Sequence, residues 1–120
     1  MENVMESQVG GNHYTRLKMQ PVEFIFKARL SFIQGSIVKY VSRYKYKNGK
    51  QDLEKCIHFS QLAIELCEVE TQVPSVGLAY CYCKTNEMSA LQTNIIVSVV
   101  KTDYHNVIRY CNQLIKNEYL

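Results

Sequence analysis

The chain has 120 residues, of which 47% are hydrophobic and 21% charged, and its formal net charge is +3 at pH 7. Length and composition are typical of one globular domain that can bury a core without disulfides or metals. The longest apolar run, residues 95–100, is far shorter than the roughly 20 residues of a membrane span. Residues 1–8 are polar and acidic, unlike a signal peptide. We therefore expect a cytoplasmic protein with no membrane partner.

The first predicted elements are a leader and a short helix. Residues 1–12 end in a glycine pair and an asparagine, which predicts a flexible leader. Pro21 favours the first position of a helix over residues 21–29, because the N–H that proline lacks would be unpaired there. The apolar side chains on one face of this helix are Val22, Ile25 and Phe26.

A helix hairpin is the central predicted element, with helices over residues 33–46 and 51–68. The inward stripe of the first helix consists of Ile37, Tyr40, Val41 and Tyr44. The inner positions of the second are Leu53, Cys56, Ile57, Ser60, Ala63, Ile64 and Cys67. Asn48 and Gly49 are typical of the turn between them, which is the most basic stretch of the chain.

The pattern weakens after a linker predicted over residues 69–77, which contains Pro74 and Gly77. Short strands within residues 76–100 remain possible, because the β-branched run 95–100 favours a strand although the preceding residues favour a helix. From Thr102 or Asp103, both good N-caps, a last helix is predicted as far as residue 117. Its apolar face consists of Val107, Ile108, Cys111, Leu114 and Ile115.

These elements predict a mainly α, single-domain protein over residues 1–120. Residues 13–68 form the candidate binding part and residues 76–120 a C-terminal helical or oligomerisation part. We see no internal repeat in the sequence. The five cysteines are not spaced as a disulfide framework or a zinc site, so they are expected to be small buried hydrophobes, and no metal is expected.

Positive charge is concentrated in the first half of the chain. Residues 1–60 contain ten Lys/Arg and five Asp/Glu, whereas residues 61–120 contain four and six. Within residues 39–55, six basic residues stand against Asp52 and Glu54. This stretch is typical either of an anion-attracting surface or of a solvated helix face with a basic turn.

The sequence has no Gly-rich phosphate loop, no nucleophile elbow and no H-E-x-x-H zinc motif. What remains is a set of cations interleaved with tyrosines. Arginine grips phosphate oxygens in pairs, lysine acts as a point charge and a tyrosine ring stacks on a base, so this set suits a nucleotide. For Tyr40 and Tyr44 a place in the core is the alternative, and Lys47 and Lys50 equally suit a soluble turn. Gln20 either fixes the turn before Pro21 or reads the edge of a base.

Four segments in order resemble a small family of phage proteins. They are G-N-H-Y at residues 11–14, Q-P-V-E-F-I at 20–25, K-Y-V-S-R-Y at 39–44 and K-N-G-K-Q-D-L-E-K at 47–55. The family was long catalogued as a domain of unknown function and includes a podophage kinase that acts on nucleoside monophosphates. The resemblance covers about residues 11–66. It implies a phage protein that handles nucleotides in the cytoplasm of an infected bacterial host.

The resemblance and the cation set together select the candidate nucleotide- and phosphate-binding residues. These are His13, Tyr14, Gln20, Lys39, Tyr40, Arg43, Lys47, Lys50 and Lys55. Pro21 and Gly49 are expected to be structural. Because Asp52 and Glu54 diverge on a helix, they do not easily chelate one ion, and no catalytic residue is expected.

Three functions follow, in order of preference. The first is a phage nucleotide-binding protein, as a homo-oligomer, that sequesters a signalling cyclic nucleotide and so counters bacterial immunity. The second is a nucleoside monophosphate kinase that uses Mg²⁺ and ATP, with Asp52 as its metal or base residue. The third is a nucleic-acid or protein-interaction module, for which steep salt dependence would be diagnostic. Nucleic acid is the less expected partner.

Overall fold

The chain folds into α-helices, as predicted. The computed structural model describes residue 4, residues 17–70 and residues 72–120, and this part of the chain contains six α-helices and no strand. They are α1 (Pro21–Ala28), α2 (Phe32–Arg43), α3 (Lys50–Glu65), α4 (Val76–Thr85), α5 (Ala90–Val100) and α6 (Tyr104–Tyr119), with a short 3-10 helix, η2 (Tyr44–Tyr46), after α2. The predicted central hairpin is α2–α3 and the predicted C-terminal helix is α6.

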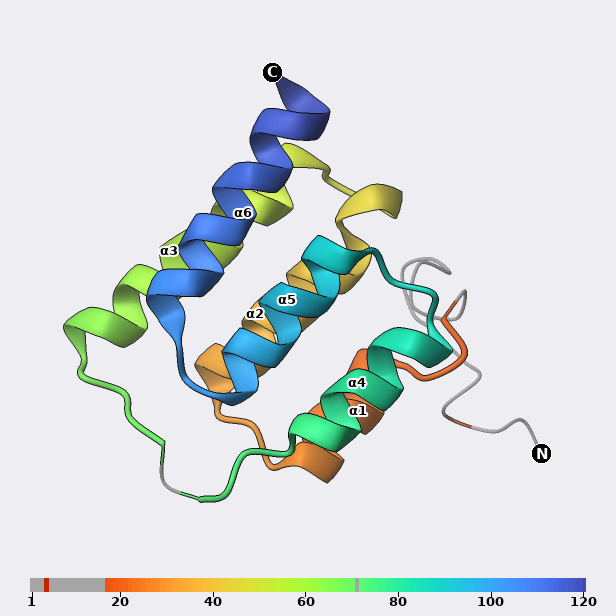
Figure 1. Cartoon of the computed structure of the whole chain (residues 1–120), viewed down its shortest axis with the longest axis vertical. Coiled ribbons are helices and arrows are strands. Elements are labelled where there is room, and N and C mark those ends of the chain that lie inside the picture. The colour runs from red at the N-terminus through yellow and green to blue at the C-terminus, as the bar shows by residue number, and fades with distance from the viewer. Residues whose placement is uncertain (1–3, 5–16, 71) are drawn as a thin grey trace.

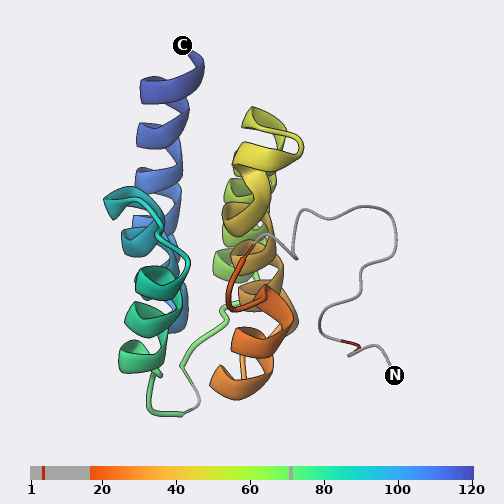
Figure 2. The same cartoon turned by 90° about the vertical axis from the view of Figure 1, so that its right-hand side faces the viewer.

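The helices form two layers, each of three consecutive helices (Figure 2). The first unit is α1–α3 and the second is α4–α6, and the connection after α3 crosses from one layer to the other. Across the layers, α1 packs on α4, α2 on α5 and α3 on α6 (Figure 1). Each helix of the first unit therefore packs against the helix that has the same position in the order of the second unit.

The two units repeat one local design that the sequence did not reveal to us. Both middle helices begin with a capping box, in which the N-cap serine and the glutamine three residues later exchange hydrogen bonds with each other's backbone N–H. In α2 the pair is Ser31 and Gln34, and in α5 it is Ser89 and Gln92. The expectation of no internal repeat is therefore wrong at the level of structure.

The turns before these two helices are separated by the same number of residues as Ser31 and Ser89 are. After α1, Arg29 has a left-handed backbone with φ 55°, and after α4, Glu87 has the same φ of 55°. The two turns have matching backbone hydrogen bonds as well. Residues 21–43 and 79–101 thus form equivalent helical hairpins, with Ile37 and Val41 of the first matched by Ile95 and Val99 of the second.

Contacts between the hairpins are reciprocal. Gln34 Nε2 donates to the carbonyl oxygen of Val99 at 2.9 Å, and Gln92 Nε2 donates to the carbonyl oxygen of Val41 at 3.1 Å. Donor matches donor and acceptor matches acceptor, which is the contact pattern of a two-fold interface between identical subunits. The chain therefore contains, within one molecule, the interface that two copies of such a unit would form.

The core lies between the two units. At its centre the equivalent residues Phe24 and Tyr82 stack on each other, with ring centroids 4.6 Å apart and an interplanar angle of 15°. Because each ring contacts its own equivalent, the approximate two-fold axis passes between them. The thiols of Cys56 on α3 and Cys111 on α6 meet in the same core. The expectation that the cysteines are buried holds for these two and for Cys83, but it is wrong for Cys67 and Cys81, which are exposed.

The suggestion of short strands within residues 76–100 is wrong, because this segment contains the two helices α4 and α5 and no strand. All residues from Ile95 to Val100 are buried, since α5 is packed against α2, α4 and α6. A helix covered on so many sides needs no polar face, so its sequence loses the helical period. The Ser89 capping box then decides its conformation.

Other differences concern helix ends and the face of α1. The first hairpin helix ends as η2, the second ends at Glu65 before the left-handed Cys67, and α6 continues to Tyr119. On α1 the buried residues are Pro21, Phe24 and Ala28, whereas Val22 and Phe26 of the predicted apolar face are exposed and Ile25 is half-buried. The Phe24 ring packs on Tyr82 of the second unit, whose position the local pattern does not contain.

Candidate functional site

Three cations surround one tyrosine on the outer face of the central hairpin. The Tyr40 ring is half-buried, and its centroid lies 4.5 Å from Lys39 Nζ, 4.8 Å from Arg43 Cζ and 5.0 Å from Lys55 Nζ. Phe59 supports the ring, with centroids 6.0 Å apart and an interplanar angle of 21°. We call Lys39, Tyr40, Arg43 and Lys55 the cation cluster. Cations this close to an aromatic ring are attracted to its face.

The fold of the hairpin assembles the cluster. Lys39, Tyr40 and Arg43 are neighbours on α2, and α3 brings Lys55 back against them because the turn at Gly49 reverses the chain. Gly49 has a φ of 56°, a left-handed value that favours glycine. The expectation that Gly49 is structural agrees with this geometry.

Arg43 is fixed by a buried ion pair with Asp52. The Asp52 carboxylate is completely buried, and it accepts hydrogen bonds from Arg43 Nε at 3.2 Å and from Arg43 Nη2 at 3.3 Å. The backbone N–H of Asn48 donates to the same carboxylate at 3.3 Å. The pair therefore fastens the end of α2 to the start of α3 and orients the guanidinium beside Tyr40.

The two lysines carry positive charge that the described residues do not balance. Within the described part of the chain, no carboxylate lies within salt-bridge distance of Lys39 or Lys55. The negative charge of Asp52 is paired with Arg43 and not with either lysine. The cation cluster thus has a net positive charge on a half-buried surface, where an anion gains more from each contact than in open water.

A groove of about 370 Å³ begins at the cation cluster and runs along α2. Its lining residues are Gln20, Pro21, Val22, Ile25, Leu30, Ser31, Phe32, Gly35, Ser36 and Lys39. Lys39 belongs to both the groove and the cluster. At the opposite end, the Phe32 ring meets Phe59 edge-on, with centroids 6.1 Å apart, so an aromatic row leads from Phe32 through Phe59 to Tyr40.

The structure brings together five of the predicted binding residues, and two others, Lys47 and Lys50, belong to neither the cluster nor the groove. Lys39, Tyr40, Arg43 and Lys55 form the cluster, and Gln20 lines the groove that starts at Lys39. Tyr40 is half-buried and only partly in the core that was its alternative place, whereas Tyr44 is fully buried. Lys47 and Lys50 are exposed at the turn. His13 and Tyr14 lie outside the described residues.

Asp52 is occupied by its structural contacts. Both of its carboxylate oxygens accept hydrogen bonds from Arg43, and one also accepts from Asn48. Within residues 17–70 and 72–120, no group of three or more His, Cys, Asp or Glu side chains is placed to hold a metal ion. A magnesium ion that used Asp52 would have to displace the guanidinium from a buried site.

Sequence reasoning missed the aromatic and glycine residues of the groove. Phe32 and Gly35 stand on the same face of α2 as Lys39, at helical spacing, and this periodicity is the one signal that could have found them. Phe59 belongs to α3, and no local pattern connects it with Tyr40.

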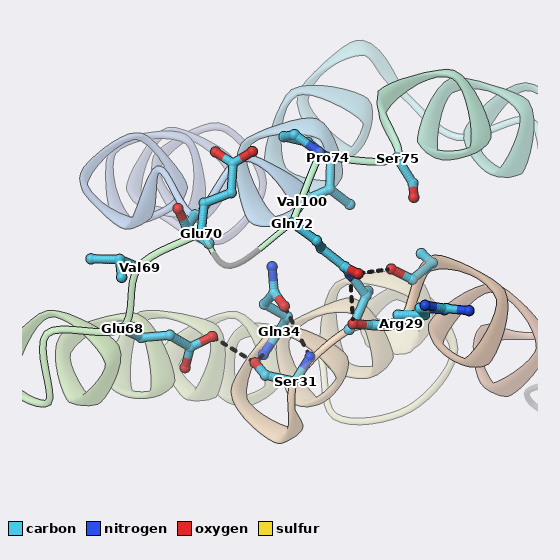
Figure 3. Close-up of a pocket in the computed structure, with 13 residues that line it drawn as sticks. Arg29, Ser31, Gln34, Glu68, Val69, Glu70, Gln72, Pro74, Ser75 and Val100 are labelled. Carbon is cyan, nitrogen blue, oxygen red and sulfur yellow. Dashed lines mark hydrogen bonds between the residues drawn. The ribbon is translucent and has the colours of Figure 1, made fainter.

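A second cavity, of about 300 Å³, lies where the connection after α3 passes the start of α2 (Figure 3). Several of its polar groups are engaged in hydrogen bonds. Glu68 Oε1 accepts from Ser31 Oγ at 2.6 Å and from the Tyr104 hydroxyl at 2.8 Å. Gln72 Nε2 donates to the carbonyl oxygens of Ala28 and Arg29. These bonds tie the connection to the start of α2 and the end of α1 in the first unit and to α6 in the second.

Titrating groups in the core are held in their protonated forms. Burial and the hydrogen bond to Glu118 raise the pKa of Tyr44, and burial and the bond to Glu68 raise the pKa of Tyr104. Burial raises the pKa of Cys83 to about 11. The hydrogen-bond partners of the two tyrosines, Glu118 and Glu68, are not members of the cation cluster.

The site is therefore a cationic, aromatic surface on one unit of an internally paired helical protein. Residues 9–61 match the model of a family described as a protein of unknown function, DUF3310. The match contains the whole cation cluster and ends within α3, so the second unit lies outside it. Neither the curated proteins nor the solved structures gave a match. No described helix has the length and apolar character needed to cross a membrane.

Proposed function

We propose that this chain is a phage nucleotide-binding protein that sequesters a signalling cyclic nucleotide and so counters bacterial immunity. The observation that carries the proposal is the cation cluster, in which one fixed arginine and two lysines surround a half-buried tyrosine ring, and the lysines have no carboxylate partner among the described residues. Such groups neutralise phosphate and offer an aromatic surface, and neither role needs bond-making chemistry.

The kinase is the second candidate, and the phage resemblance favours it. Phosphoryl transfer needs a carboxylate-held metal in addition to cations. Asp52, the residue selected for that role, is fully buried and paired with Arg43. This environment supports binding without turnover over the kinase.

The experiment that separates the candidates uses one mixture. Pure protein is incubated with Mg²⁺, ATP, nucleoside monophosphates and cyclic di- and trinucleotides, filtered, and then heat-denatured to release what it retained. One nucleotide depleted from the filtrate and recovered intact supports sequestration. New nucleoside diphosphates in the filtrate would instead identify a kinase. In a parallel incubation with single-stranded DNA, retention of the DNA alone, lost steeply with salt, would identify a nucleic-acid module.

The site is tested by charge removal with a matched control. The double variant Lys39→Ala/Lys55→Ala removes two charge-assisted contacts, each worth about 1.5–3 kcal/mol. At 1.4 kcal/mol per tenfold, affinity should fall by about 100-fold or more. Lys84→Ala/Lys116→Ala changes the net charge equally at exposed positions on α4 and α6 and should leave affinity unchanged. Equal losses in both double variants would contradict the assignment of the site.

The homo-oligomer predicted from the sequence is part of the same proposal. The paired units already supply a two-fold interface inside one chain, so further association would use surfaces outside it. Light scattering after size exclusion decides the point, because one chain has a mass of 14.0 kDa.

A further inference from the structure

We infer that the groove along α2 receives the nucleobase of the ligand whose phosphate the cation cluster binds. The inference rests on the proposed function and adds to it the place of the uncharged, planar part of the ligand. The groove and the cluster share Lys39, so one small molecule with a ring at one end and a phosphate at the other occupies both.

The groove has the size and lining of a small-molecule subsite. Its volume of about 370 Å³ falls within the range of about 300–1,000 Å³ that is typical of ligand pockets. Phe32, Gly35, Ser36 and Lys39 occupy successive turns on one face of α2, so the groove leads from an aromatic end to a cationic end. That order matches the order of base and phosphate in a nucleotide.

One polar side chain on the wall is suited to the edge of a base. Gln20 stands at the N-cap position of α1 but makes no capping hydrogen bond with its side chain. Its amide offers both donors and an acceptor to the groove. Apolar walls with a few polar groups are the usual composition of pockets that orient a ring.

The second hairpin is an internal control for what the fold itself requires. At the positions equivalent to Phe32, Gly35 and Lys39, the second hairpin has Ala90, Thr93 and Val97. It folds in the same way without an aromatic, a glycine or a cation there. The 80% exposed Phe32 is therefore not needed for the hairpin, and exposing such a ring gives no gain from burial.

Gly35 lets α1 lie close to α2 where the two helices line the groove. A Cβ atom at this position would lie 3.1 Å from Cγ2 of Ile25, closer than ordinary van der Waals contact. The glycine therefore sets the packing of Ile25, which lines the groove, against α2.

Charge decides between a small anion and an apolar partner as the occupant. An apolar segment of another protein, or a second copy of this chain, would use Phe32 but would leave Lys39 and Lys55 uncompensated beside it. A nucleotide satisfies both ends of the surface, because its base covers Phe32 and its phosphate meets the lysines.

The test compares two equally exposed phenylalanines. Phe32 lines the groove, whereas Phe26 on α1 is 82% exposed and does not line it. Affinities are measured by calorimetry for the nucleotide retained in the mixture above and for inorganic tripolyphosphate, which has charge but no ring. We expect Phe32→Ala to weaken nucleotide binding by about tenfold or more and to leave tripolyphosphate binding within about twofold. Phe26→Ala should change neither.

The outcomes separate this inference from the proposed function. If nucleotide and tripolyphosphate bind equally well and Phe32→Ala has no effect, the inference is wrong and the anion site stands. If no compound binds, both are wrong. If instead Phe32→Ala abolishes self-association of the chain, a second copy occupies the groove and the inference fails. Unchanged melting temperatures of the two variants confirm that the fold is intact.

Discussion

Replacing Arg43 with alanine should be one of the most destabilising changes on the surface of this protein. The Asp52 carboxylate beneath it is 0% exposed, while the Arg43 side chain is 12% exposed. Without the guanidinium, a buried negative charge would keep only the Asn48 N–H bond at 3.3 Å. Breaking a buried pair in this way costs about 3–5 kcal/mol. A domain of this length has a free energy of unfolding of about 6–18 kcal/mol.

Urea denaturation followed by helical circular dichroism measures the effect. With a slope of about 1–3 kcal/mol per molar urea, the midpoint should fall by about 1–5 M. The double variant Arg43→Met/Asp52→Leu removes both charges and should recover most of the loss. A midpoint shift of less than about 0.5 M for Arg43→Ala, or a double variant as unstable as the single one, would refute the argument. Because Arg43→Ala also destabilises the fold, Lys39 and Lys55 are the better positions for testing ligand binding.

Three further predictions concern the core. Gln34→Ala and Gln92→Ala should each cost about 1–3 kcal/mol, measured by the same denaturation, because each removes a buried hydrogen bond across the core and the capping-box bond to the serine N–H; clearly unequal losses would argue against the equivalence of the hairpins. Two of the five thiols, those of the exposed Cys67 and Cys81, should react with a thiol reagent in the folded protein, and the others only after unfolding. The free energy of unfolding should fall as the pH rises from about 9 to about 11, because Cys83 stays protonated when folded but ionises when unfolded; a flat profile would contradict its burial.

Local signals in the sequence predicted the first unit well. Pro21 begins α1, the apolar stripe with Ile37 and Val41 defines α2, and the basic turn joins α2 to α3. Proline geometry and helical periodicity act within a few residues, so they need no knowledge of the partner helices. Lys39, Tyr40 and Arg43 were predictable as one site for the same reason, since they share one helix.

Contacts between distant segments could not be predicted in this way. The groove needs α1 beside α2, because residues of both helices line it, and the exposed Phe32 is one of them. The sequence selects Asp52 as the metal or base residue of the kinase alternative, but the structure buries its carboxylate against Arg43. Both facts depend on how separate helices pack against each other, and this packing produces no periodic pattern of residues that could be recognised in the sequence.

The sequence by itself determined the helical class, the central hairpin and the cationic half of the chain, because these depend on short-range spacing and on composition. Only the tertiary structure decided that residues 95–100 are helical, since burial on several sides removes the helical period. Only the tertiary structure, too, showed the pairing of two equivalent hairpins. Their sequences share few residues, but the reciprocal bonds of Gln34 and Gln92 across the core require the same backbone in both.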